Sequence, residues 1–238
     1  MTTFLLLGSG EFEPWSHEVE AEALGSATGD GRVVILPTAS ATEGDDVFER
    51  WSRMGLDHYA AHDVPAEVLP VRTRQDALRA DLADRIRDAS MVFFSGGKPQ
   101  HLAEVMDGTP CWAEVLRLMD RGGVYAGCSA GAMVASRSRG QRETRPRRGT
   151  GWLFGLGLVP HATFGVHWDR VRRIPGAGLF LTSRLDDGTW FIGIDERTAV
   201  LGDGERWNVR GVGSVTVRGA GGSASYRTGD RFETTVSR

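Results

Sequence analysis

The first half of the chain alternates between short apolar runs and longer segments in which apolar residues recur at helical spacing. Five runs are typical of buried strands, at residues 4–7, 33–36, 68–71, 91–94 and 124–126. Three segments between them are typical of helices, at residues 46–61, 74–87 and 112–121. This alternation predicts an α/β fold with a doubly wound, mostly parallel sheet that is flanked by helices on both faces.

The later part of the chain shows shorter apolar runs separated by Gly and Asp turns. These runs, at residues 190–194, 198–201, 206–209 and 214–217, predict antiparallel strands at the edge of the sheet. No stretch has the composition of an interdomain linker, and there is no internal repeat. We therefore predict a single domain over residues 1–238.

The composition is ordinary for a globular protein: of 238 residues, 40% are apolar and 25% are charged, and the formal net charge is -3. Nothing in this composition or net charge indicates a nucleic-acid partner. Cys111 and Cys128 are too few for a disulfide framework and lack a metal-binding spacing, which favours a reducing compartment. The apolar run at residues 2–7 is too short to span a membrane and lacks a basic leader, so we expect a cytoplasmic protein.

One segment, residues 136–151, combines six arginines with little apolar content. A solvated surface loop is the expectation, and attraction of an anionic substrate or partner is the alternative. Glu143, which matters below as a candidate carboxylate, lies in this segment.

The most informative stretch is residues 127–131, Gly-Cys-Ser-Ala-Gly, between the apparent strand at 124–126 and an apparent helix from 130 onward. A serine on such a turn is exposed on a strained backbone, and small residues are needed beside it because a bulky neighbour would collide with the strand or the helix. The helix start also directs free N–H groups toward the reacting centre. Ser129 is therefore the candidate nucleophile.

A second glycine-bearing loop, residues 95–100, follows the strand predicted at 91–94. In a parallel sheet ligands bind at the carboxyl ends of the strands, so this loop and the serine turn share one crevice if their strands are neighbours. The N–H groups of Gly97 and Ala130 would then stabilise an oxyanion. The alternative is that Gly96 and Gly97 only form a tight turn.

A serine nucleophile needs a base, and six histidines are available. His58 and His62 are four apart, a spacing that can hold a metal, but no Glu-bearing zinc motif accompanies them and a surface pair is favoured. His101 follows the glycine loop and is a candidate for lining the site. His161 and His167 follow the serine turn in the sequence.

Four motifs in order carry a resemblance to a known family: residues 93–97, residues 127–132, the Gly-Leu-Gly-Leu run at 155–158 followed by His167, and Gly-Ile-Asp-Glu at 193–196 followed by Thr-Ala at 198–199. Together they resemble peptidase family S51, which includes dipeptidase E and cyanophycinase. The resemblance implies the class I glutamine-amidotransferase-like fold, a flavodoxin-like arrangement. It also implies that no metal or organic cofactor is required.

The resemblance assigns roles residue by residue. Ser129 would be the nucleophile, and His167 the general base and then the general acid. Glu196 stands where cyanophycinase-like members have their acid, while Glu143 is the alternative in the region used by dipeptidase E. We prefer Glu196, because a flexible-looking arginine loop would position a side chain poorly. The chain order Ser, His, acid also differs from that of α/β-hydrolases and weakens an esterase interpretation.

The chain departs from the family at positions that contact substrate. Gly165-Val166 replaces the Asp-Gln pair of cyanophycinases, and Lys98-Pro99 interrupts the glycine loop. The candidates for holding substrate are the loop residues and nearby arginines Lys98, Gln100, Arg170, Arg172 and Arg173, since a guanidinium binds a carboxylate through two hydrogen bonds. A solvated helix face is the alternative for the arginines.

Cys128 adjoins the serine and offers a rival mechanism, because glutamine amidotransferases of this fold use a cysteine nucleophile. With Gly127 and Gly131 as the flanking glycines, the central residue is Ser129, and Cys128 should point into the sheet.

We thus expect a serine peptidase that cleaves small peptides or isopeptides, with an aspartyl residue in the substrate, through an acyl-enzyme. A catalytically inactive ligand-binding or regulatory protein on the same fold is the alternative. The expected partner is a small peptide substrate, with no nucleic acid and no membrane, and formation of a homodimer is left open.

Overall fold

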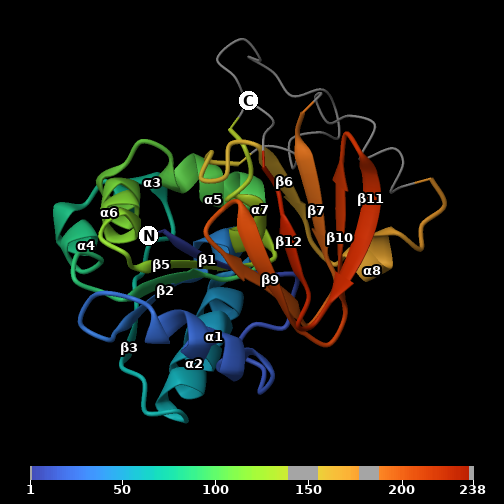
Figure 1. Ribbon diagram of the computed structural model, residues 1–238. Coiled ribbons are helices and arrows are strands. Elements are labelled where there is room, and N and C mark those ends of the chain that lie inside the picture. The colour runs from blue at the N-terminus through green and yellow to red at the C-terminus, as the bar shows by residue number, and fades with distance from the viewer. Residues whose placement is uncertain (1, 139–154, 177–187, 236–238) are drawn as a thin grey trace.

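The main body of the protein is a sheet of eight strands (Figure 1). The computed structural model describes residues 2–138, 155–176 and 188–235. The strand order is β12-β9-β8-β1-β5-β4-β2-β3. The parallel strands are β1 (Thr3–Leu7), β2 (Val33–Leu36), β3 (Ala66–Val68), β4 (Met91–Phe94) and β5 (Val124–Cys128). The antiparallel ones are β8 (Thr198–Gly202) and β9 (Arg206–Gly211), as predicted for this edge, and β12 (Arg231–Glu233), which was not predicted.

Helices cover both faces of this sheet, which confirms the doubly wound arrangement. Successive residues of a strand point to opposite faces, and in β1 Leu5 packs with Val19 and Tyr59 on one face, while Leu6 belongs to the core on the other face. The first face carries α1 (Ser16–Gly25) and α2 (Asp45–Ala60). The second carries α3 (Arg74–Ala77), α4 (Ala80–Asp84), α5 (Pro99–Met106), α6 (Pro110–Asp120) and α7 (Ala130–Met133).

A second sheet of four strands stands beside the first (Figure 1). Its order is β11-β10-β7-β6, from β6 (Ala162–Gly165), β7 (Trp190–Ile194), β10 (Ser214–Gly219) and β11 (Gly222–Arg227). Strands β6 and β7 are parallel, and the other pairs are antiparallel. Phe164 of β6 meets Trp207 of β9 edge to face, with ring centroids 5.7 Å apart, so that the two sheets share one apolar core.

Several predicted boundaries change for local reasons. The helix expected at residues 74–87 is two short helices, because Arg79 is extended at φ -73° and ψ 123°. The strand expected at residues 68–71 ends at Val68, and Pro70 in that run has no N–H for a strand ladder. Two of the four late strands, β7 and β10, join the second sheet instead of the edge of the first.

The remaining elements are η1 (Pro37–Glu43) and α8 (Trp168–Val171). None of the helices in the described ranges combines the length and the apolar character that crossing a bilayer would demand.

Most of the arginine-rich segment at residues 136–151 lies outside the described residues, which stop at residue 138 and resume at residue 155. Glu143 is therefore outside the described residues as well.

Candidate active site

Ser129 occupies a sharp turn between β5 and α7. Its backbone is in an uncommon conformation for a residue other than glycine, with φ 49° and ψ -106°. A Cβ on Gly127 would lie 2.5 Å from the carbonyl carbon of Gly131, and one on Gly131 would lie 2.2 Å from the carbonyl oxygen of Phe94. The flanking glycines are therefore required by space, as the sequence pattern predicted.

The structure brings His167 and Glu196 to this serine in one hydrogen-bonded chain. Ser129 Oγ lies 3.2 Å from His167 Nε2, and His167 Nδ1 lies 2.8 Å from Glu196 Oε1. His167 is the left-handed residue between β6 and α8, at φ 48° and ψ 38°. Glu196 follows β7, the parallel neighbour of β6. Both therefore come from carboxyl ends of the second sheet, while Ser129 comes from the first.

Glu196 is held from two further directions. Its Oε2 accepts from Arg170 Nη2 at 2.9 Å, and its backbone N–H donates to Asp169 Oδ1 at 3.0 Å. Asp169 and Arg170 both lie in α8, directly after His167. The carboxylate is thus oriented by the same short helix that follows the imidazole.

Close backbone contact at Gly8 places the end of β1 against the end of β7. The N–H of Gly8, just after β1, donates to Thr198 O at 2.9 Å. A Cβ on Gly8 would lie 2.1 Å from Asp195 O, and one on Gly193 would lie 2.6 Å from the ring of Trp168. A larger residue at Gly8 would push the turn that carries Glu196 away from β1, and a larger residue at Gly193 would push α8 away from β7.

The glycine loop after β4 lies against Ser129, because β4 and β5 are neighbours. A Cβ on Gly96 would be 3.5 Å from Ser129 Cβ. At Gly97, with φ 140°, a Cβ would be 2.4 Å from the carbonyl of Ala39, so only glycine fits. Within the described part of the chain no hydrogen bond occupies the N–H of Gly97 or of Ala130.

A buried glutamate behind this loop is absent from the sequence-based predictions. Glu11 is 4% exposed, and its Oε1 accepts the Gly96 N–H at 2.8 Å. Its Oε2 accepts from Cys128 Sγ at 2.8 Å. Burial, and then the charge of Glu11, raise the pKa of Cys128 well above its usual value, which makes this thiol a poor nucleophile. The only available signal was the position of Glu11 directly after a glycine-bearing loop at a strand end.

Ser129, His167 and Glu196 face a cleft of about 680 Å³. Its lining includes Ser129, His167, Glu196, Gly96, Gly97, Arg170, Arg50, Trp51, Met54 and Arg197. Arg197 is paired with Glu13 at 2.8 Å, whereas Arg50 has no ion pair among the described residues and lies 6.0 Å from the ring centroid of Trp51. Arg50 comes from α2, far from the motifs, which is why sequence reasoning missed it.

Other predicted contact residues lie outside this lining. Lys98 and Gln100 begin α5 next to the glycine loop, and Arg173 follows α8, but none of them lines the cleft. Arg172 is bound to Asp195 at 3.1 Å. His101 is hydrogen-bonded to the carbonyl oxygen of Arg72 at 3.0 Å.

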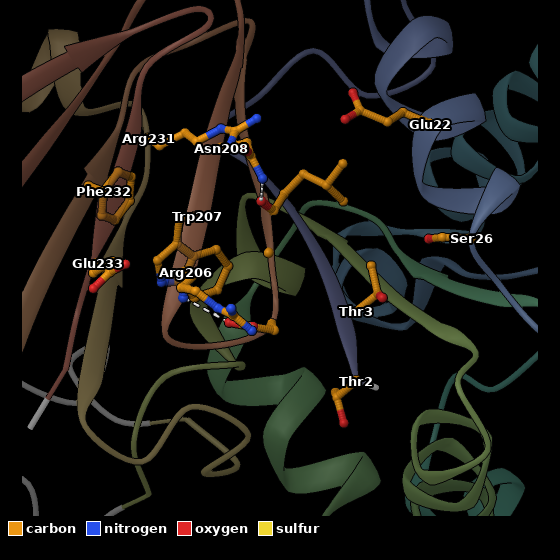
Figure 2. A pocket seen from close by; sticks show the side chains of 13 residues that line it. Thr2, Thr3, Glu22, Ser26, Arg206, Trp207, Asn208, Arg231, Phe232 and Glu233 are labelled. Carbon is orange, nitrogen blue, oxygen red and sulfur yellow. Dashed lines mark hydrogen bonds and ion pairs between the residues drawn. The ribbon is translucent and has the colours of Figure 1, made fainter.

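A second cavity, of about 540 Å³, opens at the other end of β1 (Figure 2). Figure 2 shows Thr2 and Thr3 on one side and Arg206, Trp207 and Arg231 on the other. Its lining residues include no histidine or cysteine among those that the structure describes. Because Ser129 lies at the carboxyl end of the neighbouring strand, this cavity is separate from the candidate active site.

Comparisons with known proteins give the class. The model of peptidase family S51 matches residues 4–210. The cyanophycinase of Trichormus variabilis is 30% identical over 230 residues, covering 91% of this chain and 73% of that protein. The cyanophycinase of Geminocystis herdmanii is 29% identical over 231 residues, covering 91% and 80%.

Solved structures agree with this match. A crystal structure of a peptidase from an acI-B1 Actinobacterium has a TM-score of 0.86 at 27% identity, over 98% of this chain and 97% of that one. A putative peptidase E protein from Listeria monocytogenes EGD-e shares the fold, with a TM-score of 0.62 at 17% identity, over 90% of this chain and 100% of that one. The protein is thus a hydrolase of the peptidase class. It belongs to peptidase family S51.

Proposed function

We propose that this protein is a serine peptidase whose catalytic triad is Ser129, His167 and Glu196. The observation that carries the proposal is the continuous hydrogen-bonded chain from Ser129 Oγ through the imidazole to the carboxylate, at 3.2 and 2.8 Å. Both distances are within reach of proton transfer or of a charge-assisted hydrogen bond. Nucleophile, base and orienting acid are the elements that acyl transfer requires.

The reaction would run in two halves. Ser129 Oγ attacks the peptide carbonyl carbon as His167 Nε2 takes the hydroxyl proton, and the carbonyl oxygen becomes an oxyanion. His167 then gives that proton to the leaving amine as the C–N bond breaks, which leaves an acyl ester on Ser129. A water molecule, deprotonated by the same nitrogen, attacks the ester, and the proton returns to Ser129. Glu196 keeps the proton of the neutral imidazole on Nδ1 throughout.

The N–H groups of Gly97 and Ala130 would bind the oxyanion. They belong to the two loops that flank Ser129, and neither is engaged within the described part of the chain. The N–H of Gly96 is excluded from this role because it already donates a hydrogen bond to Glu11. Each preorganised donor typically lowers the barrier by about 3 kcal/mol.

A small peptide or isopeptide that contains an aspartyl residue is the proposed substrate. The resemblance to dipeptidase E and the cyanophycinase relatives support it. The protein must hold such a substrate with its own groups, since a Cβ on Gly165 would lie 2.6 Å from the ring of Phe191 and leave no room for a polar side chain. Arg50, which has no ion pair among the described residues, is suited to bind a carboxylate, whereas Arg197 would have to exchange Glu13 for the substrate.

The remaining predicted contacts have smaller parts in this proposal. Arg170 already holds Glu196, so it acts as a positioning residue for the triad. Lys98, Gln100 and Arg173 lie beyond the cleft lining and would meet only a substrate that extends past it.

Labelling with a fluorophosphonate probe tests the nucleophile. We expect wild-type protein and Cys128→Ala to be labelled, and Ser129→Ala to remain unlabelled while its circular dichroism spectrum is unchanged. Failure to label folded wild-type protein would favour the inactive ligand-binding alternative. A panel of aspartyl dipeptides and β-aspartyl isopeptides tests the substrate, and no hydrolysis of any of them would remove the aspartyl assignment without touching the triad.

A further inference from the structure

Three histidines from two helical segments meet on the α1–α2 side of the protein, away from the triad. His58 lies near the end of α2, His62 lies in the turn after it, and His17 lies in the first turn of α1. One ligand nitrogen from each ring lies within 4.8 Å of the other two. The rings of His17 and His62 are stacked at 3.4 Å between centroids. We call these three residues the histidine cluster.

The expectation of a simple surface pair is wrong for His58. Its side chain is 4% exposed, and it lies against Glu20 of α1, whose side chain is 1% exposed. His58 Nε2 and Glu20 Oε2 are 2.9 Å apart. In the neutral imidazole this contact places the proton on Nε2 and leaves a lone pair on Nδ1.

A carboxylate behind an imidazole is the usual support of a metal-ligating histidine, since it fixes the tautomer and raises the basicity of the ligand. The other oxygen of Glu20, Oε1, is buried and makes no close hydrogen bond among the described residues, and the neutral hydroxyl of Tyr59 is the polar group that interacts with this carboxylate from the other side. A buried carboxylate with so little compensation is costly unless positive charge lies nearby. A cation bound by the cluster would supply that charge.

We propose that His17, His58 and His62 bind one divalent first-row transition-metal ion of the Zn²⁺ type, with Glu20 as the carboxylate partner of His58. Imidazole ligands suit Zn²⁺, Ni²⁺ and Cu²⁺ and do not suit Mg²⁺ or Ca²⁺. Zinc–nitrogen bonds of about 2.1 Å put ligand nitrogens about 3.3 Å apart, so the nitrogens must approach one another by no more than about 1.5 Å, and His17 and His62 leave their stacked arrangement. Solvent completes the coordination.

The site would join α1 to α2, and α2 also contributes residues to the cleft. Arg50, Trp51 and Met54, which line the cleft, are all on α2. Glu11, which supports the glycine loop, lies just before α1. A metal ion at the cluster therefore ties α1 to α2, the helix that forms one wall of the cleft, and it takes no part in the chemistry at Ser129.

Titration of the metal-free full-length protein with Zn²⁺, by calorimetry, and with Co²⁺, by visible absorption, tests the site. We expect one ion per chain, a tetrahedral Co²⁺ spectrum, and a rise in the midpoint of thermal unfolding, because the ion binds the native state. His17→Gln and His62→Gln should each weaken binding at least about tenfold, and Glu20→Gln about 10- to 100-fold with all three imidazoles retained. His101→Gln, a histidine outside the cluster, is the control and should bind as wild type does.

The results that would overturn the proposal are distinct from loss of folding. Circular dichroism identifies a variant that fails to fold, and His62, which is not buried, is the change least able to cause that. If wild-type protein binds Co²⁺ no more tightly than the triple variant H17Q/H58Q/H62Q, there is no site. If His17→Gln binds as tightly as wild type, the ion is held by the α2 pair alone and the link between helices is refuted.

Discussion

The variant Glu196→Gln, which replaces the proposed orienting carboxylate by an amide, tests the proposed triad most directly. The glutamate oxygens face two donors, His167 Nδ1 at 2.8 Å and Arg170 Nη2 at 2.9 Å. An amide has one oxygen and one NH₂ group, and the guanidinium can only donate. The amide oxygen is therefore expected to turn to Arg170, and its NH₂ group to face His167.

That orientation would disable the base. An NH₂ group donating to Nδ1 forces the imidazole proton onto Nε2, so that Nε2 has no lone pair for the Ser129 proton. The equivalent change in a Ser-His-Asp triad costs about 10⁴-fold in kcat. The side chain of Glu196 is 25% exposed here. We therefore expect a somewhat smaller loss, of about 10³-fold or roughly 4 kcal/mol in the activation barrier.

The double variant Glu196→Gln/Arg170→Met distinguishes the effect of the changed His167 tautomer on activity from the effect of losing the carboxylate charge. Without the guanidinium the amide is free to turn its oxygen to His167, and we expect about tenfold of the activity to return, roughly 1.4 kcal/mol. The assay is kcat/KM on whichever aspartyl peptide is cleaved, with the rate constant for fluorophosphonate labelling as a second measure. Glu22→Gln, which breaks a 2.7 Å ion pair with Arg210 outside the cleft, is the matched control.

Two outcomes would refute this reasoning. A loss of less than tenfold in Glu196→Gln would show that Glu196 is not the orienting acid, and would return attention to Glu143. A double variant no more active than the single one would show that Arg170 does not determine the orientation of the amide.

Three further predictions concern the scaffold. Burial and nearby acidic groups raise the pKa of Cys111 to about 11, so both buried cysteines should resist iodoacetamide at pH 8 until urea unfolds the protein, and rapid labelling of native protein would contradict this. Gly193→Ala should destabilise the protein by about 1–3 kcal/mol in urea titrations, because the Cβ would meet the ring of Trp168; Gly25→Ala, where no atom lies within 4 Å, should not. Burial would raise the pKa of Asp76, but hydrogen bonds from its neighbours lower it. Its stabilising effect is therefore present above the unfolded pKa and lost as the pH falls through the folded pKa, so Asp76→Asn should destabilise at pH 7 and lose its effect in acid; a constant difference across that range would contradict this.

The parallel core could be predicted from the sequence because four of its strands, β1, β2, β4 and β5, are nearly uninterrupted runs of buried residues. Helix α1 could not, since its buried positions include the polar Ser16 and Glu20 beside Val19 and Ala23. The division of the late strands between two sheets was also hidden. Their short apolar runs between Gly and Asp turns predict strands, but the choice of partner strand depends on contacts such as that of Phe164 with Trp207.

In the candidate site, too, residues in local sequence motifs could be predicted, and residues defined by contacts distant in the sequence could not. Ser129, His167 and Glu196 stand in local motifs, and a resemblance that orders those motifs was enough to name them. Glu11 and His17 belong to no motif. Gly96, which donates to Glu11, lies 85 positions further along the chain, and His58 lies 41 positions after His17. Such residues are found only when the fold brings the segments together.

Because the proposed triad is divided between two sheets, its activity should depend on how those sheets are docked. Ser129 follows a strand of the first sheet, whereas His167 and Glu196 follow strands of the second. A relative shift of about 1 Å between the sheets would therefore break the contact of Ser129 with His167 while each sheet stays intact. Activity should then fade at urea concentrations below those at which far-ultraviolet circular dichroism begins to change. Loss of peptide cleavage would thus reveal a change in the relative position of the two sheets before any secondary structure unfolds.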